Sequence, residues 1–282
     1  MYNLIGLAIC FNIAMLSTSA VVPSNEFTHL VDTPKVLHNS IAGQWGGHTF
    51  CYTLLGEKKL FWTATAYNED DKTPIALIGQ YSLADPYDVK FTSIRFNEPN
   101  VKGSNQPQII RTPDGYIHVF IGVTYDIGNP NLAPGKLRYY RSEKPEDIST
   151  LIDRTELIPT EPYSEFHLRM NVGISSDGDR MALVILAVSA DGKVPFNTPV
   201  VFFGKRQGLD FIFQNPMSYE KQMGFFYPQV AVTNEGVVIV GEVWDKKGLY
   251  PTRLIHIDYD GKLLHTEDIF DNINGAYFSY DM

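Results

Sequence analysis

The chain has 282 residues, 44% of them hydrophobic and 20% charged, so it is long enough to bury a core and is not expected to be disordered. Its 23 Lys and Arg residues against 32 Asp and Glu give a net charge of −9, which argues against a protein that coats a nucleic acid with a basic surface. Aromatic residues make up 13% of the chain, beside 22 Gly and 17 Pro. This composition favours strands and tight turns over helices.

The N-terminal region carries an apolar run at residues 4–16, which has the length of a signal-peptide core. A membrane-spanning helix would need about 20 apolar residues. Small residues follow at 18–20 and fit a signal-peptidase site, so we predict cleavage after Ala20 and a single domain over residues 21–282. The expected product is secreted or periplasmic and has no membrane segment. Because Lys and Arg are absent before the apolar run, an uncleaved anchor or a buried N-terminal strand is the alternative.

The chain has two cysteines, Cys10 and Cys51. Cys10 would leave with the signal peptide, so Cys51 would have no partner for an internal disulfide.

One strand pattern occurs four times: a hairpin with a tight turn, followed by a third and a fourth strand. The predicted hairpins span Gly47–Asn68, Gln106–Asp126, Arg169–Asp191 and Tyr227–Asp245. The predicted third strands span 75–83, 136–144, 199–206 and 252–259, and the fourth strands span 89–97, 155–160, 210–214 and 263–271. Since no helical periodicity competes with this pattern, each unit is predicted to be a four-stranded antiparallel sheet.

Repeated four-stranded sheets of this kind predict an all-β fold, a β-propeller of four-stranded blades. A fifth unit begins at Gly275 and stops at Met282. If residues 27–45 supply its outer strands, five blades close a ring with one blade split between the termini. We favour this arrangement over a fragment of a six- or seven-bladed propeller, because an unpaired inner edge is a liability in natural proteins.

Functional side chains of a propeller gather where the first strands of the blades begin. The candidate substrate-binding residues at these places are His48, Asn105, Gln106, Asn171, Gln229 and Tyr277. Amides bind hydroxyl groups and aromatic rings stack on sugar rings, so the set suits a polysaccharide or oligosaccharide. Such residues also commonly do no more than hold water and satisfy strand ends, and that alternative stays open.

Other polar and aromatic residues are predicted to be structural. His118 and His256 lie within strands whose neighbouring residues are apolar, and Trp62 and Trp244 lie in second strands, where they are expected to pack between blades.

The residue patterns typical of several kinds of catalytic or metal-binding site are absent from the sequence. Three acidic residues at three blade starts, as an inverting glycosidase would need, are not visible, and neither is an arginine triad for sialic acid. No Cys/His metal spacing, phosphate loop or G-x-S-x-G motif occurs. We therefore expect no cofactor and no metal ligands, and no Asp-rich loop calls for calcium in the channel.

The second unit carries a more specific signal. Residues 105–122, with the phrase DGYIHVF, and residues 137–151, LRYYRSEKPEDISTL, resemble the sialidase-like BNR-repeat propellers, a group that includes ulvan lyases and related extracellular polysaccharide enzymes. The resemblance implies a propeller fold and activity on a uronate-containing polysaccharide. Elimination from such a polymer needs a base near neutral pKa and a group that neutralises the carboxylate.

The sequence departs from that group at the catalytic positions. The two family histidines fall on Asn105 or Gln106 and on Thr124 or Tyr125. The family's Tyr-Pro-Arg stretch falls by chain order on residues 168–170, whereas the better literal match is 227–229.

His167, Arg169 and Tyr227 are the best replacements and are the predicted catalytic residues. The favoured function is thus an exported, monomeric, carbohydrate-active propeller that cleaves a polysaccharide by elimination or hydrolysis in its central channel. The alternative is a non-catalytic polysaccharide-binding or protein-interaction propeller.

Overall fold

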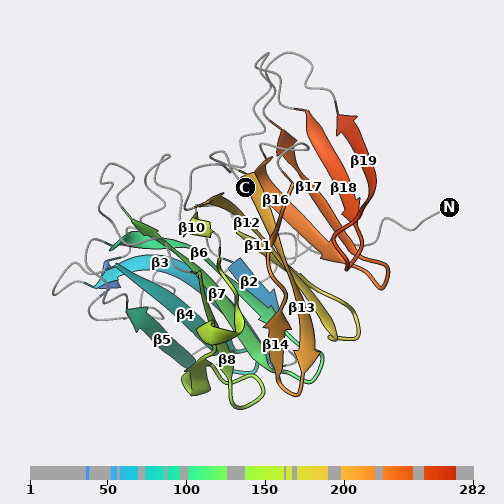
Figure 1. Cartoon of the computed structure of the whole chain (residues 1–282). Helices are drawn as coiled ribbons and strands as arrows, with labels where there is room; N and C mark the ends of the chain where they lie inside the picture. The colour runs from blue at the N-terminus through green and yellow to red at the C-terminus, as the bar shows by residue number, and fades with distance from the viewer. Residues whose placement is uncertain are drawn as a thin grey trace. The chain divides into compact units, whose positions relative to one another are not determined.

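A computed structural model describes residues 36–37, 52–55, 58–68, 74–85, 88–95, 101–125, 137–161, 163–166, 170–189, 198–219, 225–243 and 251–270. The chain divides into Met1–Pro34 and Lys35–Met282, and every described residue belongs to the second unit. The strands form four antiparallel sheets that follow one another along the chain, from blue to red in Figure 1. The prediction of an all-β propeller built from four-stranded blades is confirmed.

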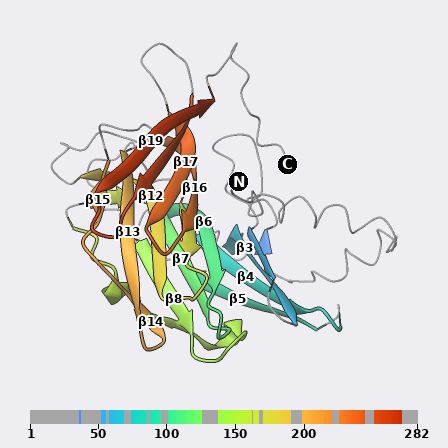
Figure 2. The ribbon, with the colours of Figure 1, turned by 90° about the vertical axis from the view of Figure 1, so that its right-hand side faces the viewer.

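Each sheet is built from a continuous stretch of strands. The first sheet holds β1 (Val36–Leu37), β2 (Tyr52–Leu55), β3 (Lys59–Asn68), β4 (Pro74–Ser82) and β5 (Val89–Arg95). The second sheet holds β6 (Val101–Arg111), β7 (Ile117–Tyr125), β8 (Leu137–Ser142) and β9 (Leu151–Asp153). The third sheet holds β10 (Tyr163–Phe166), β11 (Asn171–Ile174), β12 (Arg180–Ser189), β13 (Thr198–Gln207), β14 (Asp210–Phe213) and β15 (Met217–Ser218). The fourth sheet holds β16 (Phe225–Val232), β17 (Val237–Val243), β18 (Thr252–Ile257) and β19 (Leu263–Phe270), with β19 at its outer edge (Figure 2).

The period-two alternation of strands accounts for the packing of the sheets. In β12, Met181, Leu183 and Ile185 pack against the second sheet, whereas Ala182 and Val184 pack against the fourth. Both faces of the third sheet are therefore buried, and its strands are continuously apolar. The second sheet is covered in the same way, since alternate residues of β7 pack against the first and third sheets.

The predicted tight turns are present and share one chemistry. The hairpins of the second, third and fourth sheets begin with Thr112, Ser175 and Thr233, whose side-chain oxygens accept backbone N–H groups of the same turn at 3.1, 2.9 and 3.2 Å. Gly115 and Gly178 have φ values of +93° and +75°, which favour glycine. A hydroxyl at the first position and a glycine three residues later therefore define these turns.

One predicted strand is placed wrongly. The fourth strand of the second sheet was expected at 155–160, but it is Leu151–Asp153, and Thr155–Leu157 forms a short 3-10 helix. The carboxylate of Asp153 accepts the backbone N–H of Thr155 at 2.8 Å, which favours a turn at this point over an extended chain.

The predicted split blade falls mainly outside the described residues. Within its proposed outer segment, 27–45, the structure describes Val36–Leu37, which pairs with the end of β3 in the first sheet. The remainder of that segment, and residues 275–282, lie outside the described part of the chain.

In the described ranges, no helix is long and apolar enough to cross a membrane.

Candidate functional site

The strand that leads into the hairpin of each sheet is here called the inner strand; the inner strands are β2, β6, β11 and β16. Counted from the hairpin turn, each makes four consecutive residue pairs with the next strand. Beyond the fourth pair, the register shifts in β6 and β16, and the strand is interrupted before β11. We call these three places the inner-strand breaks; the residues just before β2 lie outside the described part of the chain.

The inner-strand breaks adjoin one another because the inner strands are neighbours in space. Strand β6 lies beside β2 and beside β11, and β11 lies beside β16. Breaks at one register in adjacent strands therefore lie at one level of the molecule. β-Bulges redirect side chains and are frequent beside functional sites, so this level is the candidate functional site.

Two of the breaks are bulges that contain a proline. In β6, Gln106 and Pro107 together lie opposite Ile121, and in β16, Tyr227 and Pro228 together lie opposite Gly241. A proline has no N–H to give to the ladder, so an x-Pro pair within a strand favours a bulge at this point.

The backbone carbonyl of Pro107, in the bulge of β6, accepts a hydrogen bond from the neighbouring first sheet. The buried hydroxyl of Thr63, from β3 of the first sheet, donates to the backbone oxygen of Pro107. This bulge is thus held in place by the adjoining sheet.

The third break is an interruption. In the third sheet, β10 and β11 both pair with β12, and residues 167–170 intervene where β12 has only Ile185 and Leu186. Strand β10 was not expected from the sequence.

Several predicted site residues lie at the breaks. Asn105 and Gln106 lie in β6 and Tyr227 in β16, at the two bulges, whereas Asn171 and Gln229 begin the four-pair segments of β11 and β16. The predicted residues outside the described part of the chain are His48, His167, Arg169 and Tyr277. In the sequence, Arg169 precedes Asn171 by two positions, as Gln106 precedes Gln108 and Tyr227 precedes Gln229.

The amide residues that begin the four-pair segments differ in how far their side chains are exposed to solvent. Gln108 is only 3% exposed, Asn171 is half-buried, and Gln229 is exposed. Gln108 lies opposite Phe120, which packs against the third sheet, so its side chain shares that face and lies within an inter-sheet contact. Of these three amides, Gln229 is the one that a ligand can reach most readily.

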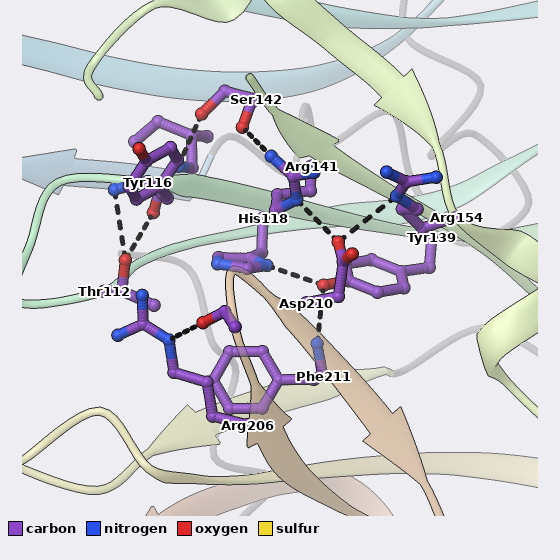
Figure 3. A network of polar contacts seen from close by, with 12 residues as sticks. Thr112, Tyr116, His118, Tyr139, Arg141, Ser142, Arg154, Arg206, Asp210 and Phe211 are labelled. Carbon is purple, nitrogen blue, oxygen red and sulfur yellow. Dashed lines mark hydrogen bonds and ion pairs between the residues drawn. The ribbon is translucent and has the colours of Figure 1, made fainter. Parts of the chain in front are cut away.

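A second group of polar residues is buried between the second and third sheets (Figure 3). The imidazole Nδ1 of His118 lies 2.8 Å from the hydroxyl oxygen of Tyr139, and that oxygen accepts the backbone N–H of Phe211 at 3.3 Å. The carboxylate of Asp210 accepts from Nε of Arg141 at 2.6 Å and from Nε of Arg154 at 3.2 Å. We call these residues the buried polar cluster.

Burial controls the protonation of this cluster. Desolvation, followed by the positive charges of Arg141 and Arg206, lowers the pKa of His118 to about 3, and burial raises the pKa of the Tyr139 phenol. Both groups are neutral at pH 7. The bond from the N–H of Phe211 to Tyr139 joins the two sheets. Because His118 is fully buried, its ring is not open to a substrate, which agrees with the structural role predicted for it.

Trp62, also predicted to be structural, packs within its own sheet. Its indole lies over Gly79, where an added Cβ would come within 2.0 Å of the ring, and it meets Phe91 edge-on at 5.5 Å.

No group of three His, Cys, Asp or Glu side chains in the described ranges is arranged to hold a metal ion. The amides and the phenol at the breaks are instead groups that exchange hydrogen bonds with hydroxyl-rich ligands.

The buried polar cluster and the common register of the breaks escaped the sequence analysis. A signal for the breaks was available, because Gln106-Pro107-Gln108 and Tyr227-Pro228-Gln229 repeat an x-Pro-Gln pattern at matching places in two units. No comparable signal marks the cluster, which joins residues far apart in the sequence.

No family model matches the chain, and no curated protein matches it. Solved structures do match the chain. A protein of unknown function from Dyadobacter fermentans is 14% identical, with a TM-score of 0.51 over 78% of this chain and 68% of that one. A Hadza microbial sialidase is 15% identical, with a TM-score of 0.46, over 73% of this chain and 43% of that one, so this chain spans less than half of the sialidase. An α-L-arabinofuranosidase from Podospora anserina, solved with cellotriose, is 12% identical, with a TM-score of 0.41 over 76% and 65%. At 14% identity the similarity to the Dyadobacter fermentans protein concerns the fold alone.

Proposed function

We propose that this protein is an exported carbohydrate-active propeller that binds a polysaccharide at the inner-strand breaks. The observation that carries the proposal is the common register of the three breaks in adjoining strands, with amide and phenol residues at two of them. Amides and phenols at one level suit a ligand that presents several hydroxyl groups along its length.

The proposed reaction is cleavage of a uronate-containing polymer by elimination or hydrolysis. The resemblance of the second unit to polysaccharide-active propellers supports it, and so does the shared sequence offset of Gln106, Arg169 and Tyr227. In the elimination, Arg169 neutralises the uronate carboxylate, His167 removes the proton next to that carboxylate, and Tyr227 gives its phenol proton to the leaving oxygen.

The remaining candidates would bind the polymer beside the reacting sugar. His48, Asn105, Gln106, Asn171, Gln229 and Tyr277 take this role in the proposal.

The test is incubation of the purified protein with ulvan, pectin, alginate and arabinan. Reducing ends and the ultraviolet absorbance of unsaturated uronates are both measured. A rise in both signals identifies a lyase, whereas reducing ends alone identify a hydrolase.

Variants then test the site. Tyr227→Phe is expected to lower kcat by about 100-fold or more if the phenol takes part in proton transfer, and Gln106→Ala is expected mainly to raise KM. The matched controls are Tyr81→Phe in β4 and Gln207→Ala at the end of β13, which leave the inner strands unchanged. Full activity in both site variants would show that the breaks are not the reactive site.

One observation favours a second candidate, a binding propeller without catalysis. The positions that carry histidines in the similar lyases hold Asn105 or Gln106 and Thr124 or Tyr125, none of which is a base near neutral pH. This candidate predicts saturable retention on an immobilised polymer, lost in Gln229→Ala, with no new reducing ends.

A further inference from the structure

The contact between the second and third sheets contains a histidine in a place that favours its neutral form. His118 lies on β7 with no solvent exposure, and its ring meets Phe211 edge-on at 5.1 Å and lies parallel to Tyr139 at 5.8 Å. Aromatic surroundings of this kind do not solvate an added charge.

The hydrogen bonds of His118 also suit the neutral ring. The Tyr139 oxygen already accepts the N–H of Phe211, so its own hydrogen is free to be donated to Nδ1 of His118. A protonated ring would carry hydrogens on both nitrogens and would have to donate to Tyr139 instead, which would displace the phenol hydrogen. Its Nε2 is buried and finds no hydrogen-bond partner among the described residues.

The charged groups around His118 do not compensate a further positive charge. Arg141 faces it from β8 and Arg206 from β13. The two nearby carboxylates are already engaged, because Asp210 from β14 pairs with Arg141 and Arg154, and Asp114 from the hairpin pairs with Arg206.

We propose that His118 makes the contact between the second and third sheets acid-labile: its ring, which packs against Phe211 of the third sheet, takes up a proton when the two sheets separate, so that acid favours the separated form. Among the described residues, the contact between the third and fourth sheets is formed by aliphatic and aromatic side chains. His256 of β18 alternates with Ile255 and Ile257, which face the third sheet, so it lies on the other face of the fourth sheet.

The sign of the effect follows from the depressed pKa of His118, about 3 against an ordinary value of 6.5. The unfolded chain takes up the proton near pH 6.5, whereas the folded protein resists it. The stability due to the neutral ring is complete above pH 6.5 and is lost progressively as the pH falls toward 3.

The test is urea unfolding of the full protein at pH 7.5, 6, 5.5 and 5, a range in which most carboxylates remain ionised. For the wild type, the unfolding equilibrium constant is expected to rise below pH 6.5 by about tenfold per pH unit through His118 alone. His118→Gln keeps a side chain that can bond to Tyr139 but does not titrate, and is expected to lose that component.

The matched control is His265→Gln, which removes an exposed histidine from β19 and should keep the wild-type pH dependence. An identical pH dependence in wild type and His118→Gln would overturn the proposal.

A measurement on the wild type covers the case in which His118→Gln does not fold. The ring resonances of His118 are followed by NMR between pH 7.5 and 5, and no titration is expected while the protein is folded. A His118 midpoint near 6.5 would overturn the proposal.

Hydrogen exchange locates the effect. Amides of β8 and β14 are expected to lose protection at pH 5 before those of β17 and β18. Simultaneous loss in all four strands would contradict separation at this contact.

Discussion

The third sheet makes two inter-sheet contacts that differ in chemistry, although both are formed by the same strands, β12 and β13. Its face toward the second sheet packs Phe202, Phe211 and Phe213 against Phe120 and Tyr139, and the buried polar cluster adjoins these rings.

Its face toward the fourth sheet packs mainly Val, Ile and Ala side chains, and a glycine lets the backbones approach. One contact gains from specific hydrogen bonds and depends on the ionisation of its groups. The other is formed mainly by close packing, with a hydrogen bond from the hydroxyl of Tyr219 to the backbone oxygen of Gly261 at 3.0 Å.

The difference shows how one continuous apolar strand serves two environments. Successive side chains of β12 point to opposite faces, so each face can be specified separately by its partner sheet. On one side, the polar groups come from the second sheet and from the end of β13 and start of β14. On the other, the fourth sheet supplies branched aliphatic residues.

The largest expected loss of stability comes from a change in the aromatic contact between the second and third sheets. Phe120 is fully buried, stacks on Tyr139 with ring centroids 4.8 Å apart, and meets Phe213 edge-on at 5.8 Å. Phe120→Ala is expected to lower the free energy of unfolding by about 3–5 kcal/mol, measured by urea denaturation.

Leu83→Ala, at a side chain 48% exposed, serves as the control and should change the free energy of unfolding by less than about 0.5 kcal/mol. A loss below about 1 kcal/mol in Phe120→Ala would mean that the aromatic contact does not carry the stability assigned to it.

Loss of an ion pair in the buried polar cluster is expected to cause the second-largest decrease in the free energy of unfolding. Asp210→Asn keeps the shape of the side chain but leaves the guanidinium of Arg141, 6% exposed, without its carboxylate. The expected loss is about 3 kcal/mol, at the low end for a buried pair because the Asp210 side chain is 23% exposed.

A matched ion pair lies on the edge of the fourth sheet, where Nη2 of Arg253 donates to Asp268 at 2.9 Å. Asp268→Asn removes the same charge at an exposed place and should cost less than about 1 kcal/mol. Equal losses in the two variants would remove the distinction between the cluster and a surface pair.

The close approach between the third and fourth sheets gives the next prediction. A Cβ at Gly173 would lie 3.0 Å from a methyl of Val232 and 3.1 Å from one of Val230. Gly173→Ala is therefore expected to cost about 1–3 kcal/mol through overpacking.

The double variant Gly173→Ala with Val232→Ala tests the mechanism. It should recover part of the loss, because the shortened side chain makes room for the added methyl. Additive losses would place the cost of Gly173→Ala elsewhere.

The fold could be predicted largely because its signals are local. The turns that begin at Thr112, Ser175 and Thr233 each combine a hydroxyl with a nearby glycine, and the strands around them alternate or run continuously apolar. The misplaced strand at 155–160 shows the limit of such reasoning. Its apolar residues fit a strand, but the local bond from Thr155 to Asp153 competes with pairing.

The site could be predicted only in part, because register is set between strands. The repeated hairpin pattern predicts Gln106 and Tyr227 at strand starts, but their equivalence depends on their position opposite Ile121 and Gly241. The buried polar cluster was not expected at all, since Arg141 and Asp210 lie 69 residues apart and meet only when two sheets pack.

The smallest expected effect concerns a half-buried contact between the third and fourth sheets. The guanidinium carbon of Arg180, the first residue of β12, lies 4.7 Å from the ring centroid of Tyr259, which follows the end of β18. Such an interaction at a partly exposed place contributes about 0.5–1 kcal/mol. Arg180→Ala should lower the free energy of unfolding by that amount, and Arg180→Lys by less, because the cation is kept.

A double-mutant cycle with Tyr259→Leu isolates the pair from other contacts of either residue. A coupling of about 0.5–1 kcal/mol is expected. It should stay constant between pH 7.5 and 5, because no histidine belongs to the pair. A coupling that disappears at pH 5 would show that acid also acts on this side of the third sheet, and would thereby remove the contrast between its two faces.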